Sequence, residues 1–171
     1  MDRHATHTDS SRQPAARGQR AFTLVEILIV VVILGILAAT VVPSFANAIE
    51  PSERSAFATS LRSFAQSTEL YRVQEGGYPQ DSTSGEIPDG LEDYIDVSTW
   101  RSETPIGGLW DSESELDGAV FGIGVHFMTD EPRDSVYMTE LDALIDNGDL
   151  TTGGFQQFED DRFYLVLQFE D

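Results

Sequence analysis

Residues 22–42 read FTLVEILIVVVILGILAATVV, and this stretch decides the fold. Glu26 is its only ionisable residue, and no further charge occurs before Glu50. From Phe22 the apolar run reaches about 20 residues, the length that crosses a bilayer as a helix. A carboxylate inside such a segment is costly, so Glu26 needs a partner for its charge. A cut before Phe22 creates an amino terminus one helical turn away, which supplies a positive charge.

The charge distribution orients this segment. The chain has 10 Arg and no Lys against 30 Asp and Glu, a formal net charge of −20. The positive-inside rule places residues 1–21 in the cytoplasm and the rest outside, because four of the arginines precede the apolar run: Arg3, Arg12, Arg17 and Arg20. Such an acidic chain repels the phosphate backbones of nucleic acids, so we expect no nucleic-acid partner. With no Cys, the fold uses no disulfide.

The segment Arg20-Ala21-Phe22-Thr23-Leu24-Val25-Glu26, followed by the apolar run, resembles the processing and assembly signature of type IV pilins and type II secretion pseudopilins. The resemblance implies that a prepilin peptidase cuts between Ala21 and Phe22 and methylates the new amine. Glu26 is then the fifth mature residue and the implied assembly residue. Gly35 and Pro43 match places where the family commonly has helix-loosening residues. The family usually has Gly before the cut, where this chain has Ala21.

Other interpretations remain open. Ala46-Asn47-Ala48 is a pattern after which signal peptidase could release a secreted soluble binding domain. Two features argue against this: the uncharged core is longer than the roughly 7–15 residues usual for signal peptides, and Glu26 lies inside it. A minor pilin of a type IV pilus and a membrane-anchored calcium-binding module that never polymerises are the further alternatives.

Hydropathy divides the chain into four segments: a leader (1–21), a transmembrane and assembly helix (22–46), an amphipathic continuation (47–76) and an acidic extracytoplasmic head (77–171). The pattern predicts one long helix from Phe22 to Glu75, with a kink or restart near Glu50, where Pro51 interrupts the pattern. We expect one apolar stripe of this helix to bury against a sheet of the same subunit: Ile49, Phe57, Leu61, Phe64 and Tyr71.

The head shows shorter patterns. They predict a short helix over 91–97, a turn over 104–108 closed by Leu109-Trp110, and strands over 119–127 and 162–169. Asp134 is expected to cap a helix running to about Ile145, with four residues facing inward: Val136, Leu141, Leu144 and Ile145. Trp100 and Trp110 are expected in the core or at its rim. The order predicts an α+β fold, a long N-terminal α-helix with a membrane-spanning first half packed on a small antiparallel sheet.

No catalytic motif is present in the sequence, and we expect no enzyme. His126 lies in a strand pattern and is expected to be a packed or edge residue. Two acidic clusters, 111–117 and 142–149, raise the question of calcium, which needs roughly 6–8 oxygen ligands. Neither has an EF-hand spacing, so we expect no cofactor and interpret both as solvated faces. If calcium does bind, the first candidates are Asp142, Asp146 and Asp149.

These features together predict a structural subunit of a type II secretion pseudopilus or a related filament. The precursor is expected in the inner membrane as a single-pass protein, with its N-terminus cytoplasmic and its head extracytoplasmic. The filament then lies in the periplasm or at the cell surface. The expected partners are homologous pilin-like subunits, the prepilin peptidase and an inner-membrane assembly platform.

The first prediction concerns processing. We expect the mature chain to start at Phe22 with a methylated amine, because only that start makes Glu26 the fifth residue. Mass spectrometry of the N-terminal peptide measures this directly. A mature chain beginning at Ile49 contradicts both the cleavage site and the resemblance to pilins.

Overall fold

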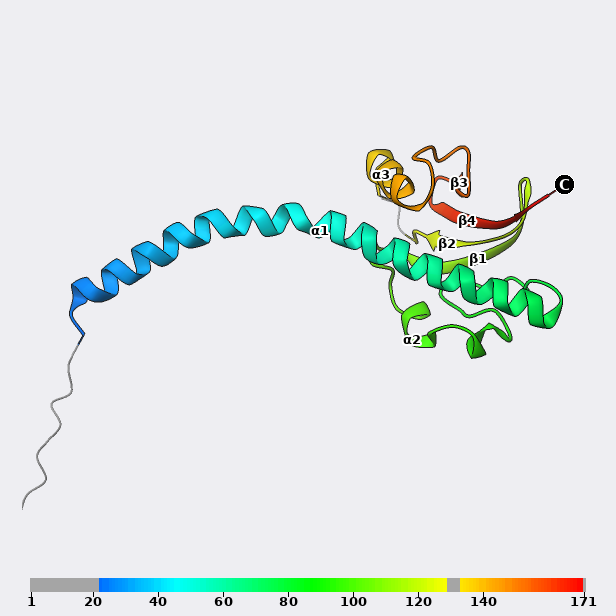
Figure 1. Cartoon of the computed structure of the whole chain (residues 1–171), viewed down its shortest axis with the longest axis horizontal. Helices are drawn as coiled ribbons and strands as arrows, with labels where there is room; N and C mark the ends of the chain where they lie inside the picture. The colour runs from blue at the N-terminus through cyan, green and yellow to red at the C-terminus, as the bar shows by residue number, and fades with distance from the viewer. Residues whose placement is uncertain (1–21, 129–132, 171) are drawn as a thin grey trace, which may run out of the picture. The chain divides into compact units, whose positions relative to one another are not determined.

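The computed structural model describes residues 22–128 and 133–170 (Figure 1). It is an α+β fold with one four-stranded antiparallel sheet, as predicted. Its elements are α1 (Leu24–Glu75), the 3-10 helix η1 (Leu91–Asp93), α2 (Val97–Trp100), β1 (Leu109–Leu116), β2 (Ala119–His126), α3 (Ser135–Ile145), β3 (Phe155–Glu159) and β4 (Arg162–Phe169). The chain divides into two compact units between Ser44 and Phe45.

The described part of the first unit is helical and apolar. Its segment Leu24–Val41 is long and apolar enough to cross a membrane, by length and composition, and none of its side chains is buried. Leucine, isoleucine and valine dominate this segment, and their exposed side chains are costly in water. The segment therefore requires an apolar environment outside its own subunit.

α1 is a single helix of 52 residues, close to the predicted range. The predicted restart at Pro51 is wrong, because the helical assignment runs through this residue without a break. Pro51 removes only one backbone donor, and the turns that follow it are held by buried side chains. α1 ends where Gly76 adopts a positive φ of 85° and its N–H donates to the carbonyl of Arg72 at 2.9 Å.

The sheet has the strand order β1-β2-β4-β3, with every neighbouring pair antiparallel. The predicted strands 119–127 and 162–169 are confirmed as β2 and β4, the two central strands. Gly124 of β2 lies opposite Tyr164, and a Cβ here would collide with the backbone carbonyl of Phe163. Glycine thus permits the close approach of the two central strands.

The edge strands were not predicted. Residues 109–116 were expected to close a turn and to begin a solvated acidic run, yet they form β1, and residues 155–159 form β3. Both sequences, LWDSESEL and FQQFE, carry many polar residues because an edge strand needs few apolar side chains. The expected order of long helix, strand, short helix, strand is therefore corrected by two additional strands.

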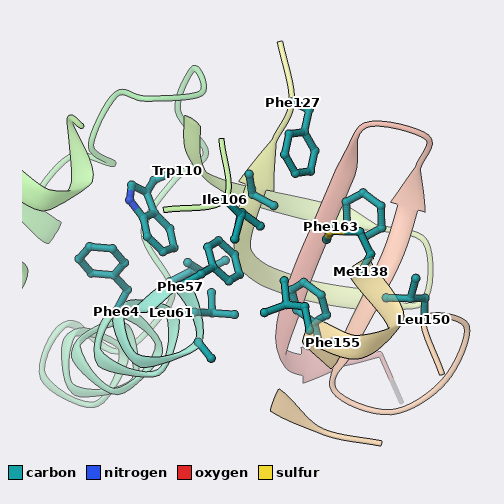
Figure 2. Close-up of a cluster of buried hydrophobic side chains, with 14 of the residues drawn as sticks. Phe57, Leu61, Phe64, Ile106, Trp110, Phe127, Met138, Leu150, Phe155 and Phe163 are labelled. Carbon is teal, nitrogen blue, oxygen red and sulfur yellow. The ribbon is translucent and has the colours of Figure 1, made fainter. Parts of the chain in front are cut away.

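The core lies between α1, the sheet and α3 (Figure 2). Phe57 of α1 stacks on Trp110 of β1 with 5.0 Å between ring centroids and 3° between planes, and meets Phe155 edge-on at 6.4 Å. One turn further along α1, Leu61 is also fully buried, and Phe64 meets Trp110 edge-on at 4.8 Å. Aromatic pairs in these geometries contribute beyond their buried area.

The predicted stripe of α1 is only partly correct. Phe57, Leu61 and Phe64 are buried, whereas Ile49 is 55% exposed and Tyr71 is half-buried. The sheet covers only the middle of this stretch of α1, so Ile49 and Tyr71, near its two ends, are not fully buried. Both tryptophans, Trp100 and Trp110, are fully buried, as expected for core residues.

α3 is confirmed, with Asp134 accepting a hydrogen bond from the Tyr137 N–H at 2.8 Å as its cap. Its predicted inward face is wrong for Val136 and Leu144, which are 68% and 49% exposed. The helix is rotated so that Tyr137, Met138 and Leu141 are buried instead. The guanidinium groups of Arg54 and Arg133 each lie 4.8 Å from the ring centroid of Tyr137 and stabilise the ring by cation–π contacts.

The predicted single helix over 91–97 is also wrong. The chain forms η1 and, separately, α2. Asp96 separates them, because its carboxylate accepts hydrogen bonds from the N–H groups of Ser98 at 2.9 Å and Thr99 at 3.1 Å. An Asp in this role starts a helix after itself, so the α-helix begins at Val97.

The second prediction concerns the core. We expect Phe57→Ala to lower the free energy of unfolding by about 3–5 kcal/mol, because it removes a fully buried ring between Trp110 and Phe155. The matched control is Leu70→Ala on the same helix, where the side chain is 51% exposed, with an expected change within about 0.5 kcal/mol. Urea unfolding of the full chain in detergent micelles measures both, and equal effects of the two substitutions contradict the described core.

Candidate functional site

The first turn of α1 contains a reciprocal set of hydrogen bonds between Thr23 and Glu26. The Thr23 N–H and hydroxyl donate to Glu26 Oε2 at 2.7 and 2.9 Å, and the Glu26 N–H donates to Thr23 Oγ1 at 3.2 Å. This is a capping box, in which residues three apart satisfy each other's free backbone donors at a helix start. The box fixes where α1 begins and where the Glu26 carboxylate lies.

The Glu26 carboxylate is thereby ordered and still reachable. Thr23 binds only Oε2, and within residues 22–128 and 133–170 the structure gives Oε1 no hydrogen-bond partner. Phe22 is 79% exposed and directly precedes the box. A cationic group from outside the helix can therefore approach the carboxylate without displacing Thr23.

The structure places the other predicted residues of this segment as follows. Ala21 lies outside the described residues. Gly35 lies within α1, and no atom lies within 4 Å of the position that a Cβ would occupy there, so its own subunit gives no steric reason for glycine. Pro43 also lies within α1. Thr23 was missed by the sequence analysis, although the T-x-x-E spacing at the start of an apolar run is the signal for a capping box.

The acidic cluster at the end of α3 does not form one site. Asp146 accepts a hydrogen bond from the Gly154 N–H, and Asp149 accepts from the Thr151 N–H at 3.0 Å and hydroxyl at 2.6 Å. These two carboxylates thus stabilise the turns of their own loop. In the described parts of the chain, no group of three or more His, Asp or Glu side chains is arranged to hold a metal ion.

Asp142 differs from its neighbours because it is fully buried, and neither of its carboxylate oxygens completes a hydrogen bond within the described residues. Burial raises the pKa of Asp142, and the negative charges of Asp146 and Asp149 raise it further. The backbone N–H groups of Gly148 and Asp149 lie close enough to offset part of this rise in pKa. The expected solvated face is therefore wrong at this position.

The prediction that the second acidic cluster, 111–117, is a solvated face is also partly wrong. Asp111 is only 3% exposed, and it accepts a hydrogen bond from the Tyr164 hydroxyl at 2.6 Å. Burial raises the pKa of Asp111. Glu113 forms an ion pair with Arg162 at 2.9 Å, and Asp117 is exposed. The cluster is thus partly a hydrogen-bonded face of β1.

The comparison with protein families agrees with the N-terminal geometry. Residues 16–42 match the family described as the prokaryotic N-terminal methylation motif. This range contains the predicted cleavage site, the capping box and most of the apolar run.

Comparisons with curated proteins find relatives over part of the chain. The chain is 38% identical over 61 residues to a type II secretion system core protein G of Pectobacterium carotovorum subsp. carotovorum, covering 36% of this chain and 39% of that protein. It is 38% identical over 63 residues to the core protein G of Pseudomonas aeruginosa, covering 37% and 44%. To that of Escherichia coli K12 it is 30% identical over 81 residues, covering 47% and 52%.

The chain thus spans about two fifths to one half of the length of the curated relatives it matches. No solved structure gives a significant match. The similarity to these relatives therefore covers less than half of this chain.

The third prediction concerns Asp142. A raised pKa in the folded state means that the native protein binds more protons than the unfolded chain between the ordinary and the raised pKa, so stability falls as pH rises through that window. We expect Asp142→Asn to raise the free energy of unfolding at pH 7 by on the order of 1 kcal/mol. The difference should shrink as pH falls through the raised pKa of Asp142, because the carboxyl group is then neutral in the fold.

Asp149→Asn is the matched control from the same loop. Hydrogen bonds from Thr151 lower the pKa of Asp149, so its contribution is present at neutral pH and is lost on acidification. We therefore expect Asp149→Asn to lower stability at pH 7, the opposite sign. Melting temperatures measured from pH 4 to pH 8 compare the two variants, and a loss of stability in Asp142→Asn at pH 7 contradicts the assignment.

Proposed function

Because the N-terminal segment of this chain is that of the type IV pilin and pseudopilin family, we propose that the chain is a structural subunit of a type II secretion pseudopilus. Glu26 carries the proposal. It is a single carboxylate at the start of a helix that has no other charge before Glu50, in the register of the methylation motif. The core protein G relatives support a secretion pseudopilus in particular.

In the proposed sequence of events, the precursor spans the inner membrane through Leu24–Val41. A prepilin peptidase cuts between Ala21 and Phe22 and methylates the Phe22 amine. The reaction belongs to the peptidase, and this chain is its substrate and has no enzymatic role of its own. An inner-membrane assembly platform then moves the subunit from the bilayer into the filament.

Glu26 sets the axial register in this proposal. The capping box holds its carboxylate at a defined place while leaving Oε1 free for the Phe22 amine of an adjacent subunit. In the apolar core of a filament such a pair is strongly favoured over either charge alone, because an unpaired buried charge is severely destabilising. A subunit displaced along the filament axis leaves both charges unpaired.

The exposed apolar surface of the first unit supports assembly of this kind. The side chains of Leu24–Val41 are all exposed within a single subunit, so lipid or neighbouring helices must cover them. The open space beside Gly35 permits close approach of another helix. Pro43 lacks a backbone donor and is proposed to loosen the adjacent turn when the subunit leaves the membrane.

Two other functions are less well supported. A minor pilin of a type IV pilus shares the whole N-terminal mechanism, but the curated relatives are secretion proteins. Release of a soluble binding domain after Ala48 would cut through α1, which runs without interruption from Leu24 to Glu75. It would also discard the capping box. We further propose that the head has no specific calcium site, since neither acidic cluster has a recognisable ligand spacing.

The fourth prediction tests the role of Glu26. Glu26→Leu removes the carboxylate from the apolar helix, so membrane insertion should be no worse than in the parent. Cleavage should be largely retained, since Ala21 and Phe22 are unchanged. Recovery in sheared filaments should fall at least tenfold relative to the parent, since the loss of one buried ion-pair partner leaves the other charge unpaired.

The matched control is Glu50→Leu, which removes an exposed carboxylate from the same helix outside the capping box. This variant should enter filaments at a level close to the parent. Fractionation into membranes and sheared filaments, with immunodetection, measures all three proteins. If Glu26→Leu and Glu50→Leu enter filaments equally well, Glu26 is not the assembly residue.

A further inference from the structure

His126 is the only histidine after residue 21, and it lies at the end of β2 in the wall of a pocket of about 690 Å3. Its side chain is 14% exposed. Ser84 Oγ lies 2.7 Å from Nδ1, and Asp161 Oδ2 lies 3.3 Å from Nε2. Asp111 Oδ2 lies 3.9 Å from Nδ1. Both ring nitrogens therefore face oxygen atoms, and two of these atoms belong to carboxylates.

The partners of His126 come from separate parts of the chain. Ser84 belongs to the segment 77–90, which links α1 to η1, and Asp161 belongs to the turn between β3 and β4. The imidazole thus connects a long loop to the sheet. The other charged groups around the pocket are Asp81, Glu86 and Asp89 of the loop, Glu113 of β1, and Arg162 of β4, which is paired with Glu113 at 2.9 Å.

The geometry argues against two other roles for this cluster. Asp111 and Asp161 face different nitrogens of the ring, so the three side chains cannot converge on one metal ion. A serine nucleophile needs backbone donors for the developing oxyanion. The N–H that follows Ser84, that of Gly85, already donates to the carbonyl of Trp110 at 2.7 Å.

We propose that His126 is a proton-dependent latch that fastens the loop 77–90 to the sheet and tightens when it is protonated. A neutral imidazole has one N–H donor, whereas the imidazolium has two. In the neutral ring with its proton on Nε2, that donor binds Asp161, and Nδ1 must accept the Ser84 hydroxyl hydrogen. The imidazolium instead donates to both Asp161 and Ser84.

Protonation also changes what Ser84 can do for Asp111. Once Nδ1 donates to Ser84 Oγ, the hydroxyl hydrogen of Ser84 is free to donate to Asp111, a contact that favours the charged carboxylate. Asp111 then has two donors, Ser84 and Tyr164. Loop, ring and strand are joined in one chain of charge-assisted hydrogen bonds, which are stronger than neutral ones.

The carboxylates around the same pocket favour a positive charge on His126. Burial raises the pKa values of both Asp111 and Glu113, the latter also through the charges of Asp81 and Asp111. A positive charge on His126 offsets part of this rise for Asp111 and reduces the repulsion among these acids. Protonation of the ring therefore strengthens the attachment of the loop.

Hydrogen exchange of the Gly85 amide measures how firmly the loop 77–90 is attached to the sheet. The Gly85 N–H is next to Ser84 and is held only while the loop lies against Trp110 of β1. For the full chain in detergent micelles, we expect the protection factor of the Gly85 amide, corrected for intrinsic exchange, to rise about tenfold between pH 8 and pH 5, as for a hydrogen bond to a charged group. The Gln157 amide, which donates to Leu150, should change little.

His126→Gln keeps a polar side chain that does not titrate, and in this variant the Gly85 protection factor should not depend on pH. An equal pH dependence in parent and His126→Gln would overturn the proposal, as would a parent protection factor that is flat or falls towards pH 5. If His126→Gln fails to fold, as judged from its Gln157 amide, Ser84→Ala decides. There the imidazole is kept and its partner hydroxyl is removed, so Gly85 protection should lose its pH dependence. If Gly85 protection keeps that dependence in Ser84→Ala, the proposal is overturned.

Discussion

One carboxylate within an otherwise uncharged segment, residues 22–49, is the constraint on which the rest of the structure depends. Glu26 is followed by no ionisable residue before Glu50, so an environment that suits the apolar side chains does not suit its charge. The capping box with Thr23 satisfies one oxygen and fixes its position. Local hydrogen bonds thus order the charge without neutralising it, and a cationic partner has to come from outside the helix. The proposed filament supplies that partner as a second copy of the amino terminus.

In the second unit, the continuation of α1 is partly buried within its own subunit, whereas the side chains of Leu24–Val41 are exposed. There α1 places Phe57, Leu61 and Phe64 against the sheet, and the aromatic rings of both elements form the core (Figure 2). Residues 77–171 are strongly acidic, with 23 Asp and Glu but only three Arg. Self-repulsion of this magnitude destabilises a compact state. The two buried carboxylates, Asp111 and Asp142, add to that cost at neutral pH.

Patterns along the sequence predicted the elements that have strong local signals. The long apolar run defined α1, Asp134 marked the start of α3, and the alternation in 119–127 and 162–169 identified the central strands. The edge strands β1 and β3 escaped prediction because most of their residues are polar, and Asp111 and Ser112 are polar although they are buried. The inward face of α3 was misplaced, because Tyr137 is buried in place of Val136. The site around His126 joins residues 84, 111, 126 and 161, and no local pattern brings such distant positions together.

A high-resolution cryo-electron microscopy structure of filaments that contain this chain will show whether Glu26 pairs with the amino terminus of another copy. We expect the methylated Phe22 amine of one subunit to lie within ion-pair distance, about 4 Å, of the Glu26 carboxylate of its neighbour, with Thr23 still bound to the same carboxylate. A filament in which each Glu26 faces solvent, or contacts only its own subunit while the Phe22 amine lies elsewhere, would contradict this pairing.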